Sequence, residues 1–273
     1  MSQVAVSPTP MSVPAFRARK GSGTPLVVLT AYDAATTSVA EAGGADAVLV
    51  GDSLGMVVLG YDSTLPVTMQ DMLHHARAVG RTRKRALMIV DMPWLSYHLG
   101  AADGVRNAAA FVRECGTDAV KVEGGAKRVP VIEAMLEAEI PVMGHLGLTP
   151  QSVLRMGGYR VQGRSEGDAE RLVADARALA AAGVFSIVLE GVPAALAARI
   201  TAEVDVPTIG IGAGPRCDGQ VLVIHDLLGL LPGPVPKFVR RYARAHEAGA
   251  EAVRRWAEDV RSGEFPSDRE TYD

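Results

Sequence analysis

Short apolar runs recur along the chain, and each of them ends in polar or charged residues. The runs are rich in Val and Ile and are apolar on both faces, whereas strands with one solvent-exposed face alternate between apolar and polar residues. This pattern predicts a parallel sheet that is covered by helices. The eight candidate strands lie at 25–33, 46–53, 86–93, 118–125, 140–147, 185–192, 206–214 and 221–226.

Helical segments lie between these runs. Segment 68–81 begins with Thr68, a residue that caps helices well, and it ends near basic residues. Strands that alternate with helices over about two hundred residues favour a closed (β/α)8 barrel, the TIM-barrel fold. A doubly wound open sheet is the alternative, and the missing GxGxxG after the first strand weakens it. The candidate helices lie at 36–43, 68–81, 101–116, 128–139, 166–183 and 193–204.

The two ends of the chain differ from this repeating middle. Segment 234–262 is strongly amphipathic and predicts a helix, either a last barrel helix with a packed tail or a contact with another subunit. Residues 1–12 contain Ser, Thr and Pro and are predicted to form a loose tail. Because no linker divides the rest, residues 13–273 are predicted to be one barrel domain with a C-terminal helical extension.

Composition narrows the class of protein. Apolar residues make up 48% of the chain, so a large core can be buried, and a net charge of −3 gives no reason to expect nucleic acid or a membrane surface as a partner. No apolar run is long enough to cross a bilayer, and no secretory signal is recognisable. Two distant cysteines indicate reduced thiols, so we expect a cytoplasmic protein.

Candidate chemistry gathers at the carboxyl ends of the predicted strands, where barrel enzymes place their catalytic groups. A single carboxylate there is often only the N-cap of the next helix, but a barrel brings all of these groups to one mouth. A divalent cation would offset the repulsion between so many acids, and carboxylate oxygens suit Mg²⁺. The strand-end residues are Asp33, Asp52, Ser53, Asp91, Lys121, Glu123, His145, Glu190, His225 and Asp226.

Two of these strand ends have a more specific reading. Lys121 and Glu123 are two positions apart and share one strand face, as a buried ion pair or as a lysine that holds an anionic substrate while Glu123 tunes it. Glu190 follows a fully apolar strand, where desolvation would raise the pKa of a carboxylate toward that of a general base. It would serve equally well as a helix cap. The glycine-rich segments 157–164 and 209–214 are either phosphate cradles or tight turns.

Six segments of the sequence stand out together: TAYDAATTSVAEAGGADAVLVGDSLGM, DAVKVEGG, PVMGHLGLTPQS, GGYRVQGR, LEGVP and PTIGIGAGPRCDGQVLVIHDLLGL. In this order they closely resemble the ketopantoate hydroxymethyltransferase family, and the resemblance runs from about residue 13 to about residue 267. It implies a TIM barrel that binds Mg²⁺, takes 5,10-methylenetetrahydrofolate as one-carbon donor and converts 3-methyl-2-oxobutanoate to 2-dehydropantoate. It also implies a homodecamer. Gly191 departs from the family, which more often has cysteine or alanine there.

The resemblance also implies a role for individual residues. Glu190 matches the catalytic base, and Asp52, Asp91 and Glu123 match the metal ligands. The implied substrate-binding residues are Asp52, Ser53, Asp91, Lys121, Glu123 and His145.

Two other functions fit the same elements. A lyase or mutase of the phosphoenolpyruvate mutase and isocitrate lyase group would share the barrel, the Mg²⁺ and an enolate-type intermediate. That group would need a catalytic cysteine loop or phosphate-binding groups, and no segment like KKCGH occurs in the sequence. A catalytically inactive barrel that serves in assembly or binding would be expected to lose some strand-end acids, and all of them are present.

Overall fold

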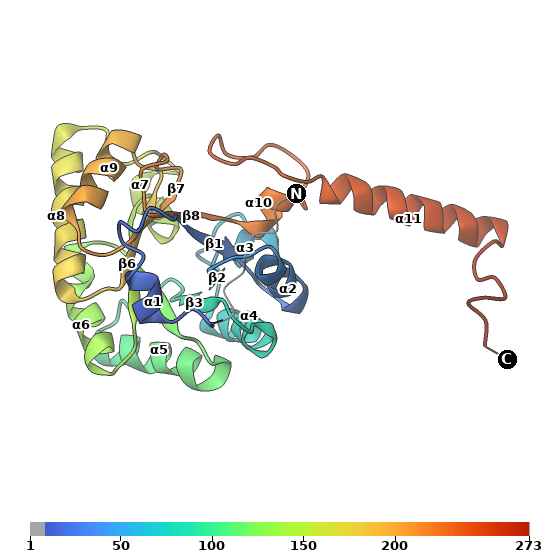
Figure 1. Cartoon of the computed structure of the whole chain (residues 1–273), viewed down its shortest axis with the longest axis horizontal. Helices are drawn as coiled ribbons and strands as arrows, with labels where there is room; N and C mark the ends of the chain where they lie inside the picture. The colour runs from blue at the N-terminus through green and yellow to red at the C-terminus, as the bar shows by residue number, and fades with distance from the viewer. Residues whose placement is uncertain (1–8, 273) are drawn as a thin grey trace. The chain divides into compact units, whose positions relative to one another are not determined.

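A closed barrel of eight parallel strands forms the body of this computed structural model, which describes residues 9–272 (Figure 1). Each strand is hydrogen-bonded to the next in chain order, and β8 pairs with β1 to close the ring. The predicted (β/α)8 barrel is therefore confirmed. The strands are β1 (Leu26–Thr30), β2 (Ala47–Val50), β3 (Leu87–Asp91), β4 (Ala119–Glu123), β5 (Val142–Gly147), β6 (Ser186–Glu190), β7 (Thr208–Ile211) and β8 (Gly219–Leu222).

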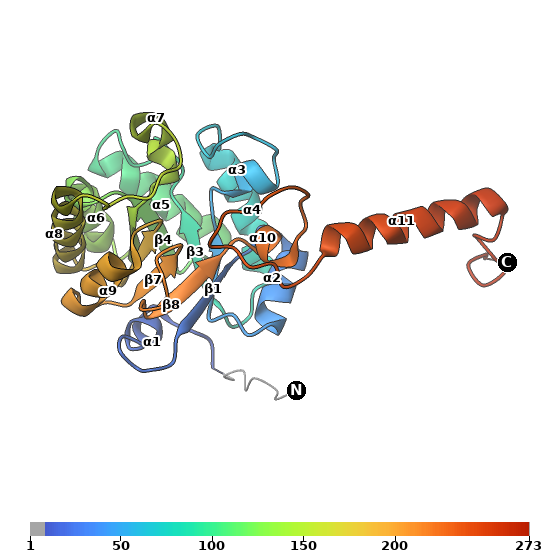
Figure 2. The same cartoon turned by 90° about the horizontal axis from the view of Figure 1, so that it is seen from above.

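Helices α5, α6, α8 and α9 lie on the outside of the strands, as Figures 1 and 2 show. Thr68 caps α4 as predicted, because its hydroxyl accepts the Asp71 N–H while Asp71 bonds back to the Thr68 N–H. The helices are α1 (Val13–Arg17), α2 (Ala34–Ala42), α3 (Leu54–Val57), α4 (Met69–Thr82), α5 (Ala101–Cys115), α6 (Val129–Glu137), α7 (Val153–Met156), α8 (Glu166–Ala182), α9 (Ala194–Glu203), α10 (Ile224–Leu228) and α11 (Ala245–Ser262), with short 3₁₀ turns at Ala126–Arg128 and Pro150–Ser152.

An apolar cluster fills the lower part of the barrel. Phe16 of α1 packs edge-on against Phe185, with ring centroids 5.6 Å apart. Strand residues of one parity, such as Ile89, Ala119 and Met143, belong to this cluster. Side chains alternate along a strand, so the residues two positions further along also face the interior. The apolar floor of the barrel and the charged groups at its mouth therefore occupy the same series of inward-facing strand positions, which are two residues apart.

The N-terminal segment is tied to the fold from Met11 onward. The Met11 N–H donates to the Arg85 carbonyl at 2.8 Å, and the Ser12 hydroxyl caps α1. Residues 1–8 of the predicted loose tail lie outside the described residues.

The chain divides into two compact units, one that ends at Ile224 and one that covers His225–Asp273. The single domain over 13–273 stays a prediction. The helix predicted over 234–262 is wrong at its start, because only Ala245–Ser262 is helical. Proline at 234 and 236 disfavours a helix at the predicted start of the segment. The strand predicted at 221–226 is also too long, because β8 ends at Leu222 and α10 begins at Ile224.

Two expectations about the chain's environment can be compared with the structure. Cys115 and Cys217 are both free thiols. Among residues 9–272, no helix combines the length and the apolar content that a bilayer crossing requires.

Candidate active site

Lys121 lies at the centre of a buried polar cluster at the carboxyl ends of the strands. Its Nζ is 2.8 Å from Asp91 Oδ1 and 3.1 Å from His145 Nδ1. Burial disfavours a charged ammonium, but the charges of Asp91, Glu123 and Asp52 raise the pKa of this lysine above its ordinary value. Lys121 therefore keeps its positive charge, and its close ion pair is with Asp91 on the neighbouring strand.

Asp52 and Asp91 form a pair of neighbouring buried acids. The Asp52 backbone N–H donates to Asp91 Oδ2 at 3.0 Å. Burial raises the pKa of Asp52 well above its usual range, and the charges of Asp91 and Glu123 raise it further. Burial also raises the pKa of Asp91, although Lys121 opposes this shift. Burial and the neighbouring acids thus disfavour ionisation of both carboxyl groups, so a nearby cation would stabilise their charged forms.

His145 connects two further acids. Its Nδ1 is 3.4 Å from Glu123 Oε1, and its Nε2 is 3.3 Å from Glu190 Oε2. Burial and the Lys121 charge oppose protonation, yet the interactions with Glu123 and Glu190 raise the pKa of His145 to about 9. Burial also opposes ionisation of Glu123, but His145 and Lys121 hold its pKa below the ordinary value. The two neighbouring acids therefore favour the protonated form of His145, against the opposing effects of burial and of Lys121.

Glu190 is the most accessible acid of this cluster. Its side chain is 16% exposed, against 4% for Glu123. Gly191 follows it with φ 55°, a backbone conformation that favours glycine, so the departure from the family suits the local chain path. The Glu190 carboxylate therefore combines a charged partner, His145, with a path to the barrel mouth.

Ser53 lies at the edge of the cluster. Its hydroxyl is 2.8 Å from the Tyr32 hydroxyl. A Cβ at position 51 would lie 2.8 Å from Ser53 Oγ and 3.5 Å from Asp91 Oδ2, so Gly51 permits the close approach of the β2 end to these groups.

Sequence reasoning missed Gln151, which links three parts of the site. Its backbone N–H donates to Glu123 Oε2 at 3.1 Å, and its Nε2 donates to Asp52 Oδ2 at 2.9 Å. The Tyr97 hydroxyl donates to its Oε1 at 2.7 Å. Neither Gln151 nor Tyr97 carries a charge or ends a strand. Only the motif HLGLTPQS, which contains Gln151, pointed to this loop.

Three strand-end candidates do not join the cluster. Asp33 is the N-cap of α2, where its carboxylate accepts the Thr36 N–H at 2.7 Å, so the helix-cap alternative holds there. His225 and Asp226 lie in α10, because β8 ends earlier than predicted.

The donor set fits a hard divalent cation held by two carboxylates. Across residues 9–272, no three His, Cys, Asp or Glu side chains converge as a complete metal site. Asp52 and Asp91 nevertheless supply neighbouring buried carboxyl oxygens, and Mg²⁺ commonly takes one or two carboxylates and fills its shell with water or substrate oxygens. Glu123 is engaged by Gln151 and His145, so its role as a third ligand stays a prediction.

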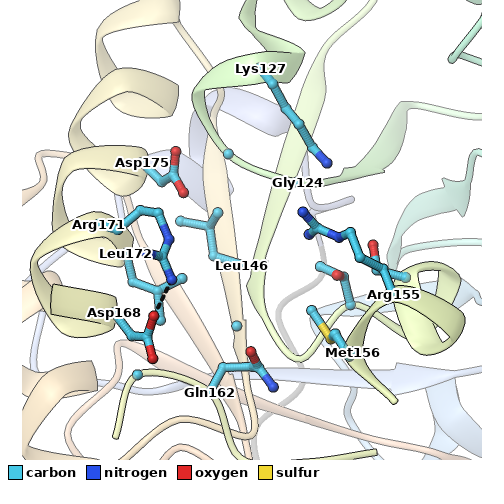
Figure 3. Close-up of a pocket in the computed structure, with 15 residues that line it drawn as sticks. Gly124, Lys127, Leu146, Arg155, Met156, Gln162, Asp168, Arg171, Leu172 and Asp175 are labelled. Atoms are coloured by element: carbon cyan, nitrogen blue, oxygen red, sulfur yellow. Dashed lines mark hydrogen bonds and ion pairs between the residues drawn. The ribbon is translucent and has the colours of Figure 1, made fainter. Parts of the chain in front are cut away.

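A cavity of about 500 Å³ opens between the loops after β4 and β5 and helix α8 (Figure 3). Lys127 and Arg155 extend into it from one side, and Asp168 pairs with Arg171 on the other. Its lining consists of Gly124, Gly125, Lys127, Leu146, Gly147, Thr149, Ser152, Arg155, Met156, Gln162, Gly163, Asp168, Arg171, Leu172 and Asp175. The cavity therefore adjoins the cluster through Gly124 and Gly147 without containing its charged groups.

A closed parallel barrel with a buried lysine, an imidazolium and converging carboxylates at the carboxyl ends of its strands defines a barrel enzyme with an acid–base site. The chain belongs to the ketopantoate hydroxymethyltransferase family, whose model matches residues 10–268.

Curated relatives are similar over nearly the whole chain. A 3-methyl-2-oxobutanoate hydroxymethyltransferase of Koribacter versatilis is 56% identical over 93% of this chain and 86% of its own length. An enzyme of the same name from Moorella thermoacetica is 54% identical over 96% of this chain and 97% of its own. The enzyme class expected from the motifs is thus confirmed.

Solved structures with the same fold have different chemistry. A 2,3-dimethylmalate lyase, described as a member of the PEP mutase/isocitrate lyase superfamily, superposes with a TM-score of 0.61 at 18% identity, over 97% of this chain and 93% of the lyase. A phosphonopyruvate hydrolase solved with oxalate and Mg²⁺ gives a TM-score of 0.61 at 16% identity, over 94% and 92% of the two chains. Likeness at this identity shows the fold alone.

Proposed function

We propose that this enzyme transfers a hydroxymethyl group from 5,10-methylenetetrahydrofolate to 3-methyl-2-oxobutanoate, giving 2-dehydropantoate for pantothenate and coenzyme A biosynthesis in the cytoplasm. The observation that carries the proposal is the position of Glu190, whose Oε2 is 3.3 Å from the imidazolium of His145 at the open edge of the cluster. Family membership supplies the reaction class.

Binding of the 2-oxo acid falls to the cationic and hydroxyl groups of the cluster. Lys121 brings a buried positive charge, and Ser53 offers its hydroxyl and amide to the substrate carboxylate. A magnesium ion held by Asp52 and Asp91 would polarise the 2-oxo group and stabilise negative charge on its oxygen. Glu123 and Gln151 hold these groups in position through their hydrogen bonds.

Proton removal is the role of Glu190. Its carboxylate takes the proton from C3 of the 2-oxo acid, and the C–H electron pair becomes the C2–C3 double bond of an enolate. Negative charge then develops on the C2 oxygen, where Lys121 stabilises it. The enolate carbon attacks the methylene carbon of the donor as one of its two C–N bonds breaks. Water then replaces the second nitrogen on that carbon and becomes the hydroxyl group. The proton from C3 and one proton of the water go to the two nitrogens of the tetrahydrofolate that leaves.

His145 has a supporting role in this scheme. Its protonated ring lies between Glu123 and Glu190, which holds the base in place. The same ring positions a water or the new hydroxyl group beside Glu190.

Incubation of the purified protein with 3-methyl-2-oxobutanoate, Mg²⁺ and a ¹³C-methylene-labelled donor tests this function. The proposal expects labelled 2-dehydropantoate in the wild-type reaction and a loss of it with Glu190→Gln. Unlabelled or absent product in the wild type would contradict the proposed transfer.

The assembly implied by the family is part of the proposal. An apolar stripe on α11 is exposed in the single chain, with Val253 at 62%, Trp256 at 55% and Val260 at 45% exposure. Such a stripe supports a homo-oligomer, and we propose a homodecamer. Light scattering on the full chain checks the mass, and a monomeric mass at working concentration would contradict it.

A further inference from the structure

Tyr159 and Met56 meet across the barrel mouth. The Tyr159 hydroxyl donates to Met56 Sδ at 3.7 Å. Met56 belongs to α3, which follows β2, whereas Tyr159 belongs to the loop between α7 and α8, which follows β5. Two strands separate β2 from β5 in the ring, so this contact spans the mouth. Figure 2 shows α3 and α7 at the same end of the barrel.

The contact between Tyr159 and Met56, here named the mouth bridge, is apolar and open to solvent. Tyr159 is 47% exposed and Met56 is 39% exposed. Val58, Leu59 and Val161 on the same two connections are 43%, 36% and 43% exposed. Several large apolar side chains thus gather beside a cluster of charged groups that binds a small anion in the proposed reaction. An exposed apolar patch beside an active site indicates a contact with another molecule.

Tyr159 lies within electrostatic range of the charged cluster. Burial raises the pKa of its phenol, and the charges of Asp52, Glu190 and Glu123 raise it further. The mouth bridge therefore lies above the groups that hold and deprotonate the 2-oxo acid, within range of their fields.

The loop that carries Tyr159 is fixed at one end and has room around its glycines. The Gln162 N–H donates to the Gly191 carbonyl at 2.9 Å, beside the catalytic base. A Cβ added at Gly157 or Gly158 would meet no described atom within 4 Å, and both residues have positive φ. Met156 and Gln162, on either side of the loop, line the cavity of Figure 3. The loop therefore has open space around its two glycines next to the mouth bridge.

A second reactant can reach the 2-oxo acid only from this mouth. The barrel below the cluster is filled by packed apolar side chains, among them Phe16, Met143 and Phe185. The donor of the proposed reaction therefore enters from the end of the barrel that carries the mouth bridge.

We propose that the mouth bridge holds the pterin of the one-carbon donor over the bound 2-oxo acid, with Tyr159 stacked on its flat pyrimidine ring and Met56 against the edge of that ring. This inference rests on the proposed function. Aromatic rings stack on flat conjugated rings, and a thioether packs well against their edges. The ligand class is thus a reduced pterin, and Tyr159 is a binding residue for the donor alone.

The experiment uses the full-length oligomer and four variants: Tyr159→Ala, Tyr159→Phe, Met56→Ala and, as a control, Leu154→Ala. Leu154 is a neighbouring apolar residue of α7 that is 80% exposed. Calorimetry gives the Kd of tetrahydrofolate, and kinetics give the KM of the methylene donor and kcat. Exchange of the C3 proton in D₂O without donor reports the acceptor half of the site.

Tyr159→Ala should weaken tetrahydrofolate binding by about tenfold or more and raise the donor KM to match. Tyr159→Phe should stay within about twofold of wild type, because ring stacking remains and sulfur is a weak acceptor. Met56→Ala should fall between these values. Leu154→Ala should bind like wild type, and donor-free exchange should be unchanged in all four variants.

Tetrahydrofolate binding by Tyr159→Ala equal to that of Leu154→Ala would overturn the inference. So would donor-free exchange slowed as much as transfer, because Tyr159 would then serve the acceptor. Wild-type protein that binds tetrahydrofolate but forms no product would contradict the proposed transfer. The tetrahydrofolate Kd values of the four variants would still test the role of the mouth bridge. Wild-type protein that exchanges the C3 proton but does not bind tetrahydrofolate would overturn the mouth bridge.

Discussion

The side-chain amide of Gln151 donates to Asp52 Oδ2 at 2.9 Å and to the Met92 carbonyl at 2.9 Å, so a residue after β5 sets the orientation of a carboxylate after β2. The Tyr97 hydroxyl holds the other end of the amide at 2.7 Å. Because the amide is held at both ends, it cannot turn without breaking buried hydrogen bonds. The proposed metal ligand Asp52 therefore depends on a chain of neutral groups.

Gln151→Ala should weaken Mg²⁺ binding by about ten- to a hundredfold, because groups that orient metal ligands have effects of this size. Titration calorimetry of Mg²⁺ into the purified protein measures it. Gln220→Ala removes an exposed amide that bonds to the Gly214 carbonyl and serves as the control. An unchanged Mg²⁺ affinity in Gln151→Ala would show that Asp52 is oriented without its amide partner.

Asp91→Ala should abolish the stabilisation that Mg²⁺ gives the wild type. A ligand that binds only the folded state adds about 2.7 kcal/mol at a hundred times its Kd. Thermal unfolding with and without excess Mg²⁺ reads this difference directly. An Asp91→Ala protein whose Tm rises with Mg²⁺ as far as that of the wild type would remove Asp91 from the metal site.

Lys121→Met should lower the free energy of unfolding by about 3–5 kcal/mol, because it leaves the buried Asp91 carboxylate without its cation. It should also abolish transfer. Urea denaturation measures the first effect, with the exposed Lys237→Met as control. The double variant Lys121→Met/Asp91→Asn should recover part of the stability and none of the activity. A double variant no more stable than Lys121→Met would contradict the account of the pair.

Glu41 lies far from the active site, and its lowered pKa contributes to the stability of the fold. Its carboxylate accepts the backbone N–H groups of Lys84, Arg85 and Ala86, at 2.6–3.0 Å. Burial opposes ionisation, but these hydrogen bonds lower its pKa below the ordinary value of 4.5. The stability that the carboxylate contributes is therefore present above pH 4.5 and is lost as the pH falls through the folded pKa.

Glu41→Gln should lower the free energy of unfolding by about 3 kcal/mol at pH 7, because hydrogen bonds to a charged acceptor are lost. The difference from wild type should shrink below pH 4.5. Urea denaturation at both pH values measures it, beside the exposed Glu133→Gln. A difference that stays constant on acidification would show that the charge of Glu41 is not the stabilising feature.

Periodicity was enough to predict most of the barrel and most of the charged cluster. Lys121 and Glu123 face inward because they follow Ala119 at intervals of two, and Ala119 belongs to the core. Asp91 follows Ile89 in the same way. A charged residue on an otherwise apolar strand face is a strong signal, so position and chemistry could be predicted together.

The missed features depend on tertiary contacts that leave no periodic trace. Gln151 and Tyr97 are neutral side chains in loops, and their hydrogen-bond partners lie 26 to 99 positions away in the sequence. The pairing of Lys121 with Asp91 is set by strand register, not by neighbours in sequence. After β8 the apolar pattern continues across prolines and predicts a helix from residue 234. The backbone restrictions of proline outweigh that periodicity at the start of the segment.

Exchange of the C3 proton of 3-methyl-2-oxobutanoate, followed by NMR in D₂O without donor, tests the central claim most directly. The account predicts that the wild-type protein with Mg²⁺ removes the C3 signal, and that Glu190→Gln exchanges at least about a hundredfold more slowly. Without Mg²⁺, exchange in the wild type should also be slow. Exchange by Glu190→Gln at the wild-type rate would contradict the assignment of Glu190 as the base.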